Sequence, residues 1–64
     1  MAKTAVWTWQ IEIVEGGKLA WGDGQTIADA DAPERYVRDG LARELAADNG
    51  MKRYRITRWK ATRS

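Results

Sequence analysis

The sequence predicts a small α+β domain in which two strands, one helix and a third strand follow one another. Two observations carry this prediction: apolar residues alternate along Val6–Glu15, and they recur at helical spacing after Pro33. The first strand is the most apolar, so we place it at the centre of a three-stranded antiparallel sheet of order 2-1-3, with the helix packed on one face. A chain of 64 residues forms one domain, residues 1–64.

The first predicted strand, Val6–Glu15, is half-buried. Its large apolar residues share one parity: Trp7, Trp9, Ile11 and Ile13. Its polar residues share the other: Thr8, Gln10 and Glu12. Successive side chains of a strand point to opposite faces, so the first group is expected in the core.

The glycine pair at residues 16–17 ends this strand, and a shorter strand, residues 18–21, follows. A two-residue turn would place Trp21 opposite Glu12, on the face away from the core. It would give that face an apolar patch: Val14, Leu19 and Trp21. A three-residue loop would place Trp21 opposite Ile11 and Leu19 opposite Ile13, on the core face. We favour the three-residue loop, because a slip of one residue exposes a tryptophan.

The second strand is expected to end, or to carry a bulge, at the Gly-Asp-Gly sequence of residues 22–24. A loop through residues 28–30 follows, and the helix then begins. Asp31 is the predicted N-cap, with Pro33 in the first turn and Glu34 at the capping-box position.

The predicted helix carries one apolar stripe: Tyr36, Val37, Leu41 and Leu45. Gly40 interrupts the stripe, and we expect it to let the helix approach the sheet closely. Asn49-Gly50 is a typical helix end.

The third predicted strand covers residues 51–60. Tyr54 and Ile56 share a parity that suits the core, but Trp59 has the opposite parity. Either a bulge near Thr57-Arg58 turns Trp59 inward, or the indole lies outside the core. The face without a helix would carry Thr8, Gln10, Glu12, Ala20, Arg53, Arg55 and, without a bulge, Trp59.

The charges are separated along the chain. Residues 1–51 carry five Lys and Arg against nine Asp and Glu, a net charge of −4, whereas residues 52–64 carry six Lys and Arg and no acid. Cations interleaved with aromatic residues are typical of nucleic-acid surfaces. The predicted binding residues are Arg53, Arg55, Arg58, Trp59, Lys60 and Arg63. In the alternative interpretation, Arg53 or Arg55 pairs with Glu12 across the sheet and the other cations are solvated edge charges.

The composition argues against an enzyme. The chain has no Cys and no His, which excludes thiolate and imidazole chemistry. Its one Ser is Ser64, and we expect no serine nucleophile. Asp29 and Asp31 lack the spacing of a calcium loop, so we expect no metal and no cofactor. No apolar run approaches the ~20 residues of a membrane span, and the start of the chain lacks a signal-peptide pattern. We expect a cytoplasmic protein with no membrane partner.

The β-β-α-β order, with a Gly-Gly turn leading into Ala20-Trp21, resembles the partial RNase H-like domain of HicB-type antitoxins over about residues 5–58. That family usually has a proline- and glycine-rich segment after the second strand, where this chain has Trp-Gly-Asp-Gly-Gln at residues 21–25. The resemblance implies a small, dimeric regulatory protein, and it assigns no role to any residue.

These observations predict a small non-enzymatic binding or regulatory domain, a homodimer that contacts nucleic acid through its basic C-terminal strand. The alternative is a protein–protein interaction module, an inhibitor or antitoxin-like partner, that uses the sheet face not covered by the helix.

Overall fold

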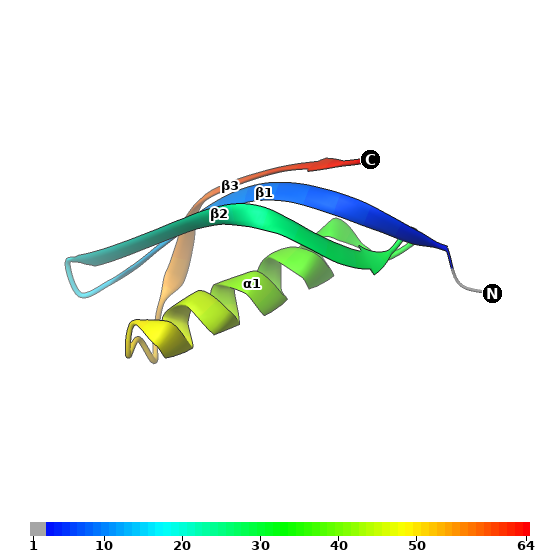
Figure 1. Ribbon diagram of the computed structural model, residues 1–64. Helices are drawn as coiled ribbons and strands as arrows, with labels where there is room; N and C mark the ends of the chain where they lie inside the picture. Colours follow the sequence, from blue (N-terminus) through cyan, green and yellow to red (C-terminus); the bar gives the residue numbers. More distant parts are fainter. Residues whose placement is uncertain (1–2) are drawn as a thin grey trace.

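A computed structural model describes residues 3–64 and shows a three-stranded antiparallel sheet with one helix (Figure 1). The elements are β1 (Thr4–Glu15), β2 (Lys18–Asp29), α1 (Glu34–Asp48) and β3 (Arg55–Arg63). The strand order is β2-β1-β3, which confirms the predicted α+β class and topology. The third strand begins and ends later than the predicted segment 51–60.

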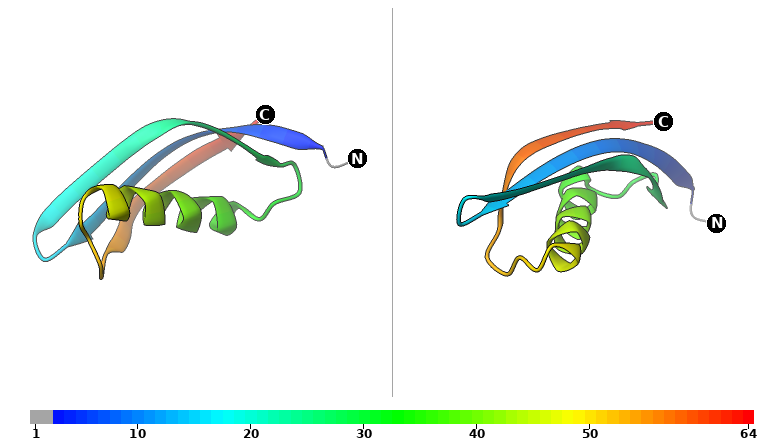
Figure 2. Two further views of the ribbon diagram at one scale, coloured as in Figure 1. Left: turned by 60° about the horizontal axis from the view of Figure 1, so that its bottom comes forward. Right: turned by 60° about the vertical axis from the view of Figure 1, so that its left-hand side comes forward.

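The sheet arches over α1, so that its concave face holds the helix and its convex face is free (Figures 1 and 2). The molecule is elongated, with extents of 42 × 17 × 16 Å. A helix of 15 residues is about 22 Å long, so α1 covers only part of the length of the sheet. We call the convex side, formed by the side chains that point away from α1, the outer face.

The β1–β2 hairpin has a two-residue turn, so the three-residue loop that we favoured is wrong. Glu15 pairs with Lys18, and the φ angles of Gly16 and Gly17 are 54° and 82°. Two consecutive positive φ angles are what a type I′ turn requires, and the twist of this turn matches that of the strands it joins. The register therefore places Trp21 on the outer face, where it is 63% exposed.

The second strand continues through residues 22–24 to Asp29, so neither the predicted end nor the predicted bulge occurs there. Gly24 pairs with Trp9, and Gly22 pairs with Ile11. A Cβ atom on Gly24 would lie 3.3 Å from Cζ2 of Trp9. The two glycines thus leave space for the large side chains of β1 on the concave face.

The core lies between the concave face and α1. Its buried residues are Ala5, Trp7, Ile11, Ile13, Ala20, Val37, Ala42, Ala46 and Met51. The predicted face of β1 is confirmed, although Trp9 is only half-buried. Ala20, which we expected on the open face, is buried on the helix side because of the two-residue turn.

The helix approaches the sheet through alanines. Ala42 is fully buried, whereas Tyr36, predicted in the apolar stripe, is 75% exposed. Leu41 and Leu45 are partly buried against the core. Gly40 is exposed, with nothing within 4 Å of the position of a Cβ atom, so the close approach does not depend on it. The small side chains of the buried alanines, and not the absence of a side chain at Gly40, let the helix approach the sheet closely.

The sequence predicted the C-terminal end of α1 correctly but not its N-cap. Pro33 is the N-cap residue and no side chain caps the helix, so the role predicted for Asp31 is wrong. At the other end the prediction is confirmed: Asn49 is the C-cap, its Nδ2 donates to the carbonyl oxygen of Leu45 at 2.8 Å, and Gly50 has a φ of 67°.

A β-bulge divides β3 and resolves the parity of Trp59. Glu12 pairs with Arg58 and the next residue, Ile13, pairs with Ile56, so Thr57 is the extra residue. The bulge turns both Trp59 and Ile56 toward the helix side, where they pack against the core. Of the two alternatives for Trp59, the bulge is confirmed. β3 bends sharply along its length (Figure 1), as bulged strands do.

Candidate nucleic-acid interface

The outer face is organised in rows that run across the three strands. Residues directly opposite one another in the ladder give each row one side chain from β2, one from β1 and one from β3. The three rows nearest the hairpin are Leu19–Val14–Arg55, Trp21–Glu12–Arg58 and Asp23–Gln10–Lys60. Each of these rows thus ends in a cation on β3. We call Arg55, Arg58 and Lys60 the cation column.

The cation column is exposed, and in the described part of the chain it has no ion-pair partner. All three residues are exposed, and within residues 3–64 the single ion pair joins Arg38 and Asp39 on α1. The pairing of Arg53 or Arg55 with Glu12, which the alternative interpretation expected, is wrong, because the bulge places Arg58 opposite Glu12. The carboxylate of Glu12 instead accepts a hydrogen bond from the hydroxyl of Thr57 at 3.0 Å.

Two of the predicted binding cations lie elsewhere. Arg63 is opposite Trp7 on the concave side, and its Nη1 donates to the carbonyl oxygen of Ala30 at 2.7 Å. Arg53 precedes β3, and its backbone N–H donates to the carboxylate of Glu15. The structure therefore gathers three of the five predicted binding cations on the outer face and separates the other two from it.

The aromatic residue beside the cation column is Trp21, not Trp59. Trp59 is half-buried on the concave side, and its indole nitrogen is buried without a hydrogen-bond partner in the described part of the chain. Trp21 lies in the same row as Arg58 and is largely exposed. The sequence feature that indicates the exposed position of Trp21 is the glycine pair of residues 16–17, because two adjacent glycines favour a two-residue turn.

Two open hollows lie side by side on the outer face. The first has a volume of about 300 Å³ and is lined by Gln10, Ile11, Glu12, Trp21 and Arg58. The second has a volume of about 220 Å³ and is lined by Thr8, Trp9, Gln10, Lys60 and Thr62. Gln10 borders both hollows, and each hollow has one member of the cation column at its rim.

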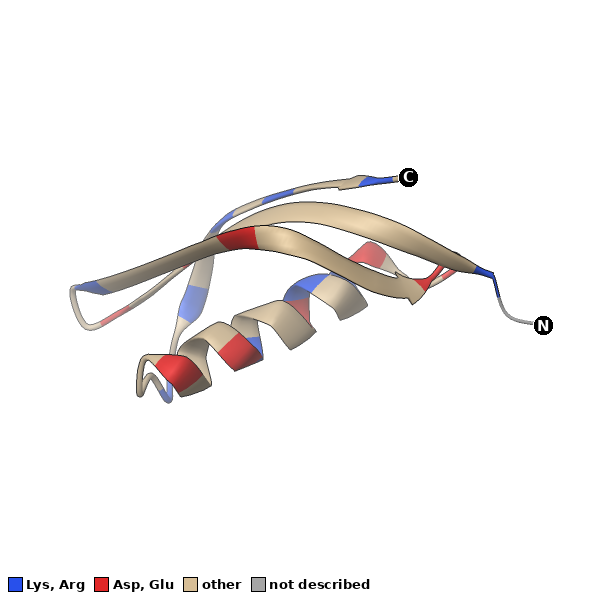
Figure 3. Ribbon diagram, viewed as in Figure 1, with Lys and Arg blue, Asp and Glu red and all other residues tan. Residues whose placement is uncertain are grey.

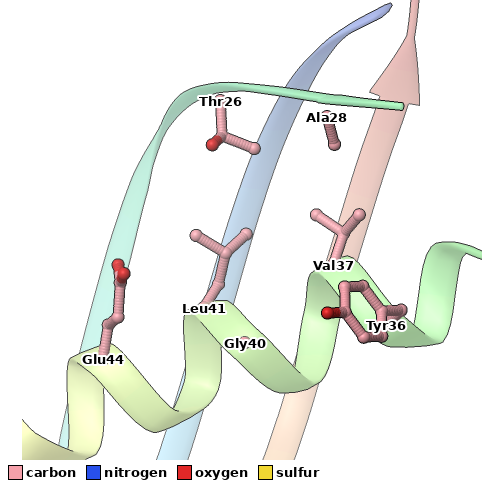
Figure 4. Close-up of a pocket in the computed structure, with 7 residues that line it drawn as sticks. All are labelled: Thr26, Ala28, Tyr36, Val37, Gly40, Leu41 and Glu44. Atoms are coloured by element: carbon pink, nitrogen blue, oxygen red, sulfur yellow. The ribbon is translucent and has the colours of Figure 1, made fainter. Parts of the chain in front are cut away.

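A third hollow lies on the other side of the sheet, between β2 and α1 (Figure 4). Val37 and Leu41 point from the helix toward Thr26 and Ala28, whose small side chains leave the space open. Glu44 is the one charged residue of its lining. This cleft is mostly apolar and offers no paired acid and base.

The distribution of charge favours the outer edge of β3 as the basic surface. Lys and Arg recur along β3, which has no Asp or Glu, whereas the acids lie on α1, on the other two strands and on the β2–α1 connection (Figure 3). Between residues 3 and 64, no group of three or more His, Cys, Asp or Glu side chains could hold a metal ion. In the same range, no helix has the length and apolar character needed to cross a membrane.

No protein-family model, curated protein or solved structure matches the chain. The resemblance to the HicB-type antitoxins therefore rests on the order of the elements and the sequence of the hairpin alone.

Proposed function

We propose that this chain is a small, non-enzymatic regulatory domain that binds nucleic acid through the outer face of its sheet. The observation that supports it best is the cation column: Arg55, Arg58 and Lys60 line one edge of a free face, and none has an ion-pair partner within residues 3–64. Unpaired cations on a sheet face attract phosphates, and each contact releases counterions from the nucleic acid.

The exposed indole of Trp21 adds a second element that such surfaces use. Aromatic side chains offer a stacking platform to any base, whereas cations hold the backbone without reading sequence. Glu12, Asp23 and Asp29 lie on the same face and reduce its positive potential. We therefore expect binding of moderate affinity that is governed by salt.

The test is a salt titration of binding with single-charge variants. Three phosphate contacts predict a slope of log K against log[salt] of about −2 to −3. Arg58→Ala and Lys60→Ala should each weaken binding and reduce that slope by about one. Arg43→Ala is the matched control, because Arg43 is exposed on α1, away from the outer face, and its loss should change neither quantity. Affinity that ignores salt, or an equal effect of Arg43→Ala, would contradict the proposal.

A second candidate function is protein recognition through the same face, including formation of the expected homodimer. The observation that favours it is that four of the exposed large apolar residues lie there: Val6, Leu19, Trp21 and Ile27. Large exposed apolar residues on one face mark protein-binding surfaces.

Light scattering and a nuclease-treated pull-down test this candidate. It predicts either the mass of a dimer or the capture of one stoichiometric protein that persists after nuclease digestion. A Trp21→Ala/Ile27→Ala double variant should abolish the association. A monomer that captures no protein would rule it out.

A further inference from the structure

We infer that the ligand of the outer face is a single nucleic-acid strand, with its backbone along the cation column and a base stacked on Trp21. This inference rests on the proposed function and adds to it the form of the nucleic acid and its orientation on the sheet.

The cations lie on one side of the face only. β2 contributes Asp23 and Asp29 to the outer face and no Lys or Arg, whereas β3 contributes Arg55, Arg58 and Lys60. A duplex groove is bordered by two phosphate backbones, so a sheet that enters it needs cations at both edges. A single strand has one backbone, which matches the single column.

The width of the face matches a nucleotide laid across it. β2 and β3 are separated by two interstrand spacings, about 9.5 Å, with β1 between them. A phosphate held by Arg58 therefore leaves its base above β1, within reach of the indole of Trp21 on the far strand. The hollow between these two side chains is where the base would lie.

The spacing of the two hollows favours bases that are spread apart. Successive rows of the outer face lie two residues apart along the strands, about 6.8 Å. That is twice the rise of about 3.4 Å per nucleotide in a B-form strand, so stacked neighbours cannot occupy adjacent hollows. An unpaired strand can unstack and follow the convex curve of the sheet.

Polar groups on β1 can meet the edge of the base. Gln10 presents an amide that both donates and accepts, and the carboxylate of Glu12 accepts only. Base edges are free for such contacts in a single strand, whereas Watson–Crick pairing occupies them in a duplex.

The experiment compares a labelled single-stranded DNA of about 12 nucleotides with the duplex of the same sequence, by fluorescence anisotropy at one salt concentration. We expect the single strand to bind at least about ten-fold more tightly. Equal or tighter binding of the duplex would overturn this inference and leave the proposed function intact. Binding of neither would overturn both.

Variants on β2 test the position of the base. Trp21→Ala should weaken single-strand binding by about 5- to 150-fold, the range that one base–aromatic stack represents, and Trp21→Phe should restore most of it. Ile27→Ala is the matched control, because Ile27 is 71% exposed on the same strand and face but lies in a row with Val6 and no cation. Unchanged affinity in Trp21→Ala, or an equal loss in Ile27→Ala, would overturn the stacking geometry.

Discussion

The guanidinium carbon of Arg63 lies 5.5 Å from the centroid of the Trp7 ring, on the concave side of the sheet. The same side chain donates to the carbonyl oxygen of Ala30, just after the end of β2. Arg63 thus ties the end of β3 to the β2–α1 connection. The four cations of β3 therefore divide into Arg63, which holds the fold together, and the cation column, which is free to bind.

This division predicts that replacing Arg63 lowers the stability of the protein, whereas replacing Arg58 does not. Arg63→Ala should lower the free energy of unfolding by about 1–2 kcal/mol, because it removes a cation–π contact and a charge-assisted hydrogen bond. Arg58→Ala should change that free energy by less than about 0.5 kcal/mol, because Arg58 is an exposed surface residue without an ion pair to any described residue. Urea titrations followed by circular dichroism measure both.

Nucleic-acid binding measured on the folded fraction should show the reverse order, with a loss in Arg58→Ala and little change in Arg63→Ala. A loss of affinity in Arg63→Ala without any loss of stability would contradict the division.

The hairpin turn predicts a contrast between its two glycines. Gly17→Ala should destabilise the protein by about 1–2 kcal/mol, because a φ of 82° places a Cβ atom in a region that L residues avoid. Gly16→Asn should be neutral or slightly stabilising, since Asn-Gly is a favoured type I′ pair. Thermal unfolding compares the two variants. An equal loss of stability in Gly17→Ala and Gly16→Asn would be inconsistent with a two-residue type I′ turn.

The contact between β2 and Trp9 predicts a contrast between Gly22 and Gly24. A Cβ atom on Gly22 would lie 3.7 Å from Cδ1 of Leu45, an ordinary contact, whereas one on Gly24 would crowd the Trp9 indole. Gly22→Ala should stabilise the protein by about 0.4–1 kcal/mol through the unfolded chain. Gly24→Ala should be less stable than Gly22→Ala by about 1 kcal/mol, because the indole must shift. Chemical denaturation of the matched pair checks this, and a more stable Gly24→Ala would refute it.

The opposite locations of Trp21 and Trp59 can be measured by acrylamide quenching. Trp21 is largely exposed, whereas Trp59 is half-buried and packs against the core. The readily quenched part of the emission should therefore disappear in Trp21→Phe and persist in Trp59→Phe. The reverse result would support the three-residue hairpin loop and an outward Trp59.

The order of elements and the buried face of β1 were predictable because they follow from a strict alternation over a long segment. Trp7, Ile11 and Ile13 share one parity, and no other arrangement buries them together. The C-terminal end of the helix was also predictable, because Asn49-Gly50 is a typical helix end. These features depend on local periodicity, which a sequence displays directly.

Of the two hairpin registers we favoured the wrong one, because the three-residue loop would have buried Trp21. In the structure, small residues of β2 face the large residues of β1, and Trp21 is left outside. The competing signal was the turn: two adjacent glycines fit a two-residue connection, and turn geometry fixes register.

The candidate site was predicted in part for the same reason. Arg55, Arg58 and Lys60 do share the outer face, but their aromatic neighbour comes from β2, so the site depends on the register. The concave location of Arg63 depends on the bulge, which places each residue after Thr57 on the face opposite to the one it would occupy in a regular strand.

The bulge at Thr57 also bears on how the molecule avoids aggregation. β3 is an edge strand, and an unbroken edge offers backbone groups to which another chain can add a strand. The extra residue interrupts that ladder and bends the strand, next to Arg58. Deleting Thr57 would leave a straighter, more regular edge, with Ile56 still opposite Ile13 and Arg58 still opposite Glu12, so the extra residue protects the edge against fibril-like pairing.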